Sequence, residues 1–315
     1  MATTAEVSED GLPLLTSEAA AVGPTEDPVA GAKAARRRRR TIWSRLSIPG
    51  KVAAVLIVLV ALAAVFAPLI SPADPNAGVT AERLGGFGAG GHLLGTDGQG
   101  RDLLSRMIWG ARPSLLTGLV PVLVATVIGT TIGIAGGLAG RLANTLTMRV
   151  LDVFYAFPAI LLAIAIATVL GSGSSNSIIA LSVILIPPIA RLAEGETARL
   201  RSLDFMEAAT ASGARRSTIA VRHVLPNVGP PILVYSTALI GLSIVYAAGL
   251  SFLGLGLQPP TAEWGLMVSD LRQYIFGNPG LALVPAVAIL IVSVAFNILG
   301  DSLRDAIDVK LGTQS

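Results

Sequence analysis

Six apolar runs of about twenty residues each constrain what this chain can fold into. An α-helix needs about 20 apolar residues to cross the roughly 30 Å of hydrocarbon in a bilayer. The runs are continuous and do not alternate with period two, which disfavours a transmembrane β-barrel. We therefore predict an all-α polytopic membrane protein whose six transmembrane helices cover residues 52–70, 114–140, 150–170, 177–193, 232–253 and 281–299.

Composition agrees with this class of protein. Of the 315 residues, 52% are hydrophobic and 14% are charged, as is typical of a multispan membrane protein. The 34 glycines suit helices that pack closely through small side chains. The chain has no cysteine, so disulfides and thiolate metal sites are excluded.

Residues 1–41 precede the first apolar run and predict a disordered cytoplasmic tail, followed by a transmembrane domain over residues 42–315. Residues 1–32 are acidic and show no sustained apolar period. Residues 36–40 are five arginines, which could bind nucleic acid. Directly before an apolar span, such a run more often fixes orientation and touches anionic lipid, so we expect no nucleic-acid partner. The first apolar run is too long for a usual signal peptide, so we interpret it as an anchor.

The distribution of Lys and Arg predicts the orientation. Basic residues are concentrated in the tail and in residues 141–149, 191–223 and 301–315. Residues 71–113, the short GSGSSN turn and residues 254–280 hold fewer, several of them near Asp or Glu. Cytoplasmic segments carry the excess of Lys and Arg, so both termini are expected in the cytoplasm.

The second apolar run places Gly129, Gly133 and Gly137 at four-residue spacing on one helix face. Small residues let two helix backbones approach closely, so this face should pack on another helix. The sequence leaves open whether that helix belongs to this chain or to a partner subunit.

Prolines occur inside several of the apolar runs. They are expected to kink or interrupt helices, because proline lacks the amide hydrogen and its ring clashes with the preceding turn. The residues concerned are Pro121, Pro158, Pro187, Pro188 and Pro285.

The cores of the spans contain almost no ionisable residue, and Asp152 lies at the cytoplasmic end of the third. Ion-coupled pumps usually need buried ionisable groups. The histidines, His92 and His223, fall on opposite sides of the membrane in the predicted topology, so they cannot form one site. No phosphate-binding loop occurs either. The chain therefore predicts a passive channel or a transporter driven by another polypeptide.

A polar stretch, EAATASGARRSTIAVRHVLPN, separates the fourth and fifth runs at residues 207–227. Glu207 is followed by two alanines, whose small side chains would let a partner approach the backbone. Gly213 permits a backbone turn that a Cβ would penalise, and Leu225-Pro226 is expected to end the second helical piece. On physical grounds the stretch is either a plain helical connector or a docking element.

These residues resemble the signature loop of binding-protein-dependent ABC importer permeases: an acid with two alanines, a glycine four residues later and a closing Leu-Pro. Two further segments, HLLGTDGQGRDLLSRMIWGARPSL at 92–115 and LSFLGLGLQPPTAEWGLMV at 250–268, resemble the dipeptide, oligopeptide and nickel branch, particularly its C-type subunit. The RHVLPN sequence is also typical of that branch. The resemblance covers about residues 42–311.

The resemblance implies a type I ABC importer permease fold with a cytoplasmic coupling helix that docks on an ATPase. It implies a coupling loop over residues 194–229 and an extracytoplasmic loop over residues 71–113. ATP and Mg would be bound by the ATPase, so this chain is expected to hold no catalytic residue, metal or cofactor. The coupling residues carried over are Phe205, Met206, Glu207, Ala208, Ala209, Gly213, Leu225 and Pro226.

The partners implied are a homologous B-type permease, one or two cytoplasmic ATPase chains, an extracytoplasmic substrate-binding lipoprotein and membrane lipid. The implied location is the inner (plasma) membrane of a bacterium, and the implied substrate is a dipeptide or oligopeptide. Nickel or glutathione import is the nearer alternative. An ATP-independent secondary transporter and a membrane-embedded enzyme are more distant ones.

Small polar residues on helix faces are expected to line the substrate path between the two permeases, although such residues also join helices to each other. The residues are Thr126, Thr130, Ser236 and Ser243.

Polar residues also mark the extracytoplasmic segments. There Asp97, Arg101 and Asp102 are expected to pair and order the loop, with contact to the binding protein as the alternative. Glu263 and Trp264 predict a helix at the membrane interface, where Trp is enriched, with the same alternative.

Overall fold

The computed structural model describes residues 42–312, so the predicted tail at residues 1–41 lies outside the described residues. The short α2 (Ile42–Arg45) opens the described part, and a compact unit begins at Arg45. Residues 42–312 form helices and turns with no β-strand. The predicted all-α class is confirmed.

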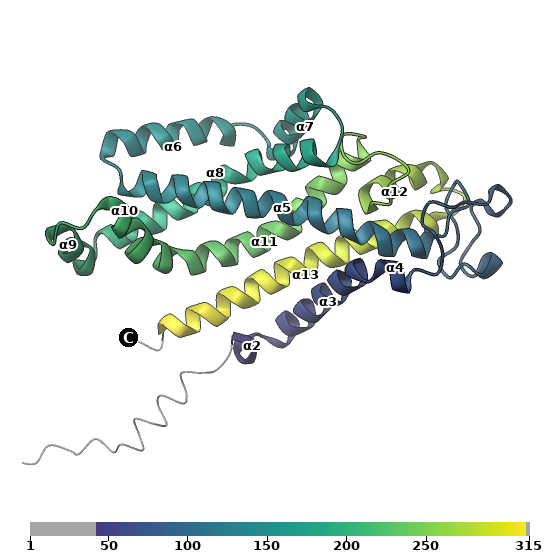
Figure 1. Cartoon of the computed structure of the whole chain (residues 1–315), viewed down its shortest axis with the longest axis horizontal. Helices are drawn as coiled ribbons and strands as arrows, with labels where there is room; N and C mark the ends of the chain where they lie inside the picture. Colours follow the sequence, from purple (N-terminus) through teal and green to yellow (C-terminus); the bar gives the residue numbers. More distant parts are fainter. Residues whose placement is uncertain (1–41, 313–315) are drawn as a thin grey trace, which may run out of the picture. The chain divides into compact units, whose positions relative to one another are not determined.

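Five helices of this unit are long and apolar enough to cross a membrane (Figure 1). α5 lies at their centre and contacts α3, α8 and α11. The five are α3 (Ile48–Val65), α5 (Leu103–Leu138), α8 (Ser174–Arg201), the continuous helix Arg216–Phe252 and α13 (Pro279–Gly312). The continuous helix comprises α10 (Arg216–Ile219), a π-helical turn (Ala220–Val224) and α11 (Leu225–Phe252).

The third predicted span, residues 150–170, is wrong as a single helix. The structure has α6 (Arg141–Tyr155) and α7 (Ala159–Leu170), which are bent by 86° at the break. Pro158 stands at that break and precedes α7, where its missing amide hydrogen costs no helical bond. The 12 residues of α7 extend only about 18 Å, so α7 needs α6 to complete a crossing.

The other prolines, which were expected to kink or interrupt helices, do not interrupt them. α5 continues through Pro121, α8 through Pro187 and Pro188, and α13 through Pro285. Pro121 and Pro187 are buried against neighbouring helices. Packing of this kind retains a helix across the hydrogen bond that proline removes.

The glycine face of α5 packs on α8 of the same chain. A Cβ at Gly129 would lie 2.9 Å from the Ile186 carbonyl oxygen, and one at Gly133 would lie 2.6 Å from the Ala193 Cβ. Gly137 meets the same helix one turn further on. These distances are shorter than real Cβ contacts, so the two helix backbones approach as closely as they do because α5 has no side chain there.

Most connections lie at two ends of the bundle, and the break between α6 and α7 lies between these ends (Figure 1). The loop end holds residues 71–102 and 253–278, which include η1 (Thr80–Glu82), η2 (Ala89–Gly91), α12 (Trp264–Leu271) and η4 (Arg272–Tyr274). α4 (Ala67–Ile70) leads into it from α3. The α9 end holds residues 202–215 with α9 (Asp204–Ala211).

Both predicted loops include the ends of long helices. The loop predicted over residues 71–113 ends at Asp102, because the Asp102 carboxylate accepts a hydrogen bond from the Ser105 amide (2.6 Å) and caps α5. The coupling loop predicted over residues 194–229 leaves only residues 202–215 outside the long helices. The polar ends of helices continue beyond the apolar runs that identify them.

Candidate functional site

The polar stretch singled out in the sequence forms a short helix at the α9 end. α8 ends at Arg201, two residues follow, and α9 runs for eight residues from Asp204. Its N-cap residue, Leu203, provides no side-chain hydrogen bond. Asp204 and Glu207 lie in the first turn, where negative charge complements the helix dipole.

Gly213 ends α9 in a Schellman arrangement. Its φ is +77°, in the left-handed region, and its amide donates to the Thr210 carbonyl at 3.0 Å. The Ala214 amide donates to the Ala209 carbonyl at 3.3 Å. These two bonds satisfy the last carbonyls of the helix and require the backbone conformation that glycine adopts most readily. The predicted turn at Gly213 is confirmed as a backbone feature.

α9 presents two different faces. Met206 is 4% exposed and belongs to the same buried apolar cluster as Ile219 and Val224. Phe205 is 42% exposed, and Glu207 and Ala208 are exposed. Met206 therefore holds α9 to its own chain and does not offer the free apolar contact expected of it, because it lies about 100° around the helix from Phe205 and Glu207.

Ala209, the second of the two alanines, is half-buried, so only part of the predicted small-residue surface is open. The ring of Phe205 lies 6.5 Å from that of His223, which places the exposed aromatic near the π-helical turn. The exposed residues of α9 thus include the Phe205 ring, the carboxylates of Asp204 and Glu207, and the Ala208 methyl group.

Leu225-Pro226 does not end a helical piece as predicted. The helix runs on from Arg216 to Phe252, and the turn before Pro226 is π-helical, with the Leu225 amide donating to the Ala220 carbonyl. This wider turn precedes the residue that lacks an amide hydrogen, so the helix continues without a break. π-helical turns of this kind are rare and often lie at functional sites.

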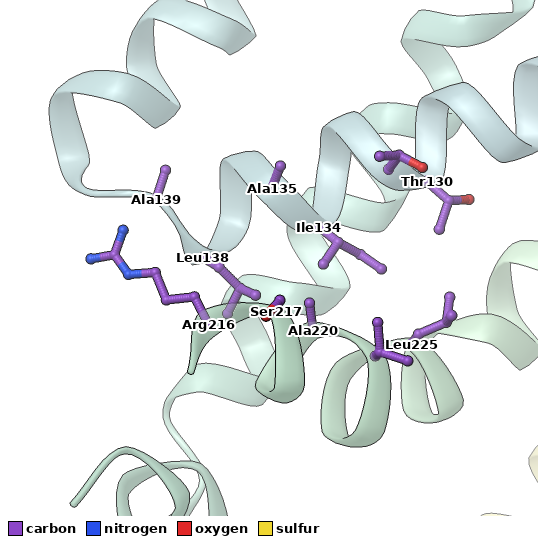
Figure 2. Close-up of a pocket in the computed structure, with 11 residues that line it drawn as sticks. Thr130, Ile134, Ala135, Leu138, Ala139, Arg216, Ser217, Ala220 and Leu225 are labelled. Atoms are coloured by element: carbon purple, nitrogen blue, oxygen red, sulfur yellow. The ribbon is translucent and has the colours of Figure 1, made fainter. Parts of the chain in front are cut away.

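A groove of about 430 Å³ separates the end of α5 from the helix that follows the Gly213 turn (Figure 2). It is lined by α5 residues between Thr130 and Ala139 and by residues between Arg216 and Leu225. Leu225, one of the predicted coupling residues, is 42% exposed and borders it.

The four predicted pathway residues are not grouped together within this chain, and their place on a path between two permeases stays a prediction. The hydroxyls of Thr126 and Ser236 hydrogen bond to each other at 2.8 Å and join α5 to α11. Ser243 is fully buried, and its hydroxyl has no hydrogen-bond partner in the described part of the chain. Only Thr130 borders the groove. Thr126 and Ser236 therefore join two helices, as small polar residues commonly do in membranes.

A buried charged cluster orders the loop end, as expected for Asp97 and Arg101. The Arg101 Nε lies 2.6 Å from the Asp97 Oδ2, and both residues are 3% exposed. Arg106, which the sequence did not single out, lies 3.3 Å from the same oxygen and donates to the Pro75 carbonyl at 3.0 Å. Its sequence signal is a charged residue about one turn after the start of a mostly apolar helix, which indicates a buried partner.

His92 joins the cluster through Asp102. The His92 Nδ1 lies 2.7 Å from the Asp102 Oδ2, and its Nε2 lies 3.3 Å from the Glu82 Oε2. The hydrogen bond with Asp102, then that with Glu82, raises the pKa of His92 above its usual value. The imidazole therefore bridges the cap of α5 and the 3-10 turn η1.

Glu263 and Trp264 start the predicted helix, α12, and both side chains are buried within this chain. Glu263 caps α12 by accepting from the amides of Gly265 (2.9 Å) and Leu266 (2.8 Å). The Trp264 indole donates to the Met107 carbonyl at 3.0 Å. Burial raises the pKa of Glu263 although these hydrogen bonds act to lower it. Both residues attach α12 to α5.

Within residues 42–312, no three His, Asp or Glu side chains are grouped to hold a metal ion. At the α9 end, a short helix is held by the buried Met206 and leaves Phe205, Glu207 and Ala208 exposed. The geometry at the loop end is that of an ordered cap.

A family model described as binding-protein-dependent transport system inner membrane component matches residues 125–312. A glutathione transport system permease protein, GsiD, of Escherichia coli O1:K1 / APEC is 45% identical over 259 residues, which are 82% of this chain and 86% of that protein. The protein of the same name from Pectobacterium atrosepticum is 43% identical over 286 residues, which are 90% and 95% of the two chains.

A solved structure of the MetNI methionine ABC transporter, in an inward-facing conformation, has the same fold. The TM-score is 0.52 with 22% sequence identity, and the match covers 65% of this chain and 96% of that one.

Proposed function

The chain belongs to the family of binding-protein-dependent transport system inner membrane components, the permeases of ABC importers, and we propose that it forms half of the translocation pathway in an importer of small peptides. Its relatives are named for the transport of glutathione, which is itself a small peptide. Dipeptides and oligopeptides are therefore in the proposed substrate class together with glutathione. Nickel is the alternative.

The observation that carries the proposal is the exposed face of α9. Met206 holds this short helix to the bundle, while Phe205, Glu207 and Ala208 remain open to a partner. On this proposal the open face docks on a cytoplasmic ATPase, which binds ATP and Mg. Nucleotide-driven movement then reaches α8 and the Arg216–Phe252 helix, since α9 is joined to both by only a few residues. The ATPase shifts the permease between two states through its differential contacts.

The proposed orientation follows from the docking face. The α9 end and both termini lie in the cytoplasm, and the loop end lies outside the inner (plasma) membrane of a bacterium. The excess of Arg in residues 191–223 supports this arrangement. A binding lipoprotein would deliver substrate to the loop end, and a homologous permease would form the other half of the path.

Reconstitution tests the proposal. The chain is co-purified with the second permease, the ATPase and the binding protein, and the complex is placed in liposomes. Uptake of glutathione, a dipeptide, an oligopeptide and Ni²⁺ is then followed with and without ATP. We expect ATP-dependent uptake of at least one peptide, and loss of uptake when the ATPase is inactivated.

Two results would contradict the proposal. Uptake that persists without ATP would make the chain a secondary transporter. ATP-dependent uptake of nickel alone would support the assignment as an importer and contradict the proposed peptide substrate.

A further inference from the structure

The groove between α5 and the Arg216–Phe252 helix is not filled by any described residue, and it is open at the surface of the helical bundle. Its volume is about 430 Å³. On the α5 side it extends from Thr130 to Ala139, about 14 Å along the helix. Ile134, Leu138 and Ala220 form its middle, so the space between the two ends is apolar (Figure 2).

One end of the groove is cationic. The Arg216 side chain points toward Ala139 and away from the apolar middle (Figure 2). The Arg201 guanidinium lies at the same end, where it donates to the carbonyls of Gly137 (2.8 Å) and Ala139 (3.3 Å). All eleven lining residues belong to the described part of the chain, and none of them is acidic. No hydrogen bond or ion pair joins Arg216 to another described side chain.

The cationic end lies where the helices leave the apolar layer. α5 ends at Leu138, and Arg141 follows. The helix on the other wall begins at Arg216, and its apolar stretch follows Arg222 and His223. Arg and Lys at such boundaries attract the anionic head groups of the adjacent leaflet. The groove therefore presents an apolar channel inside the layer and positive charge at its edge.

We propose that this groove binds an anionic phospholipid. One acyl chain lies along Ile134 and Leu225, and the phosphate lies between Arg216 and Arg201. An amphiphile with one negative head and an apolar tail matches both halves of the groove. An apolar helix of another subunit would match only the apolar half of the groove and would leave the exposed Arg216 charge at its end without a partner.

The bound lipid would hold α10 against the end of α5. α10 directly follows the Gly213 turn, so the lipid would brace the segment that joins α9 to α11. This binding does not depend on the proposed transport function, because the groove is formed by this chain alone.

The test uses the full-length chain, delipidated in detergent, with phosphatidylglycerol as the probe. Native mass spectrometry measures binding of phosphatidylglycerol, phosphatidylcholine and inorganic phosphate. Arg216→Gln is compared with Arg222→Gln, which removes the same charge from an exposed position that does not line the groove. Arg216→Lys retains the charge, and Ala135→Phe fills the apolar half.

We expect phosphatidylglycerol to bind more tightly than phosphatidylcholine. Arg216→Gln should lower the affinity for phosphatidylglycerol about fivefold, while Arg222→Gln leaves it unchanged. Arg216→Lys should retain most of the affinity, and Ala135→Phe should weaken binding of the lipid with Arg216 in place. The secondary structure of each variant, measured by circular dichroism, establishes that it is folded.

Three results would overturn the proposal. Equal loss in Arg216→Gln and Arg222→Gln would mean that the lipid is bound by general surface charge. Inorganic phosphate that binds as tightly as phosphatidylglycerol would reduce the site to a free-anion site. In the assembled complex, a photo-crosslinker at position 135 that reacts with the second permease and with no lipid would show that protein covers the groove.

Discussion

Single residues at the α9 end act in two different ways. Gly213 acts through its backbone: its φ is +77°, and a Cβ added there would meet nothing within 4 Å. Met206 acts through its side chain, which is 4% exposed. The sequence could predict the turn at Gly213, because a left-handed backbone conformation favours glycine. It could not predict which of Phe205 and Met206 is buried, because both are apolar and only the rotation of α9 decides.

Replacing Gly213 with alanine is expected to destabilise the α9 turn by about 1 kcal/mol, since an L-residue is strained in the left-handed region. The matched control is Gly195→Ala. Gly195 is an exposed helical glycine with open space around its Cβ position, where alanine should stabilise the helix by about 0.5–1 kcal/mol. Hydrogen exchange of the α9 amides measures both. Equal protection in the two variants would show that the turn at Gly213 carries no strain.

His92 predicts a pH dependence of the loop end. Hydrogen bonds with Asp102 and Glu82 raise the pKa of His92 above 6.5. A raised pKa gives a stability contribution that is complete below 6.5 and is lost as pH rises through the higher folded value. Thermal unfolding of the wild type and of His92→Gln should therefore differ more at pH 5.5 than at pH 8.5. If the wild type and His92→Gln differ in stability by the same amount at pH 5.5 and pH 8.5, protonated His92 does not stabilise the loop end.

At the scale of elements, α9 is a small helix held by one side chain between two long helices. Its open face and its buried face come from the same eight residues. Attachment of α9 to the bundle and docking of a partner on α9 can therefore be tested separately, by mutating adjacent residues of this helix. The Arg216–Phe252 helix, in contrast, is long and continues through Pro226, because a π-helical turn precedes that proline. Sequence reasoning placed a helix end there, since proline usually marks one.

Met206→Ala should loosen α9, with a cost of about 2–5 kcal/mol for truncating a buried methionine. Phe205→Ala truncates an exposed neighbour and should leave the protection of α9 nearly unchanged. Hydrogen exchange separates the two variants in the isolated chain. In the complex, Phe205→Ala should reduce co-purification of the ATPase while α9 stays ordered. Normal ATPase recovery with Phe205→Ala would mean that the ring is not a docking contact.

At the scale of the whole molecule, the apolar runs predicted the long helices and the all-α class. They did not predict where the helices end, since α5 begins at Leu103 and α8 extends to Arg201 beyond the apolar cores. Apolarity alone did not show the bend between α6 and α7, because it does not distinguish a straight span from a broken one, but the prediction that Pro158 kinks or interrupts its helix is confirmed there. The buried Arg106 escaped notice for a related reason, since its partners lie in segments distant in sequence.

The bent pair decides the topology and can be tested with single cysteines, because the chain has none. α5 leads into α6 at one end of the bundle, and the Gly173 amide donates to the Leu255 carbonyl (3.3 Å) at the other. If α6 and α7 together make one crossing, Gly140→Cys should label from the same side as Ser202→Cys.

Ser172→Cys and Asp74→Cys should be labelled from the opposite side of the membrane. The reagent is a membrane-impermeant maleimide, added either to whole cells or to inverted vesicles. Gly140 has open space around it and a negative φ, so the substitution is not expected to disturb the turn. Labelling of positions 140 and 172 from one side would make α6 and α7 a re-entrant pair. The chain would then cross the membrane five times, and its termini would lie on opposite sides.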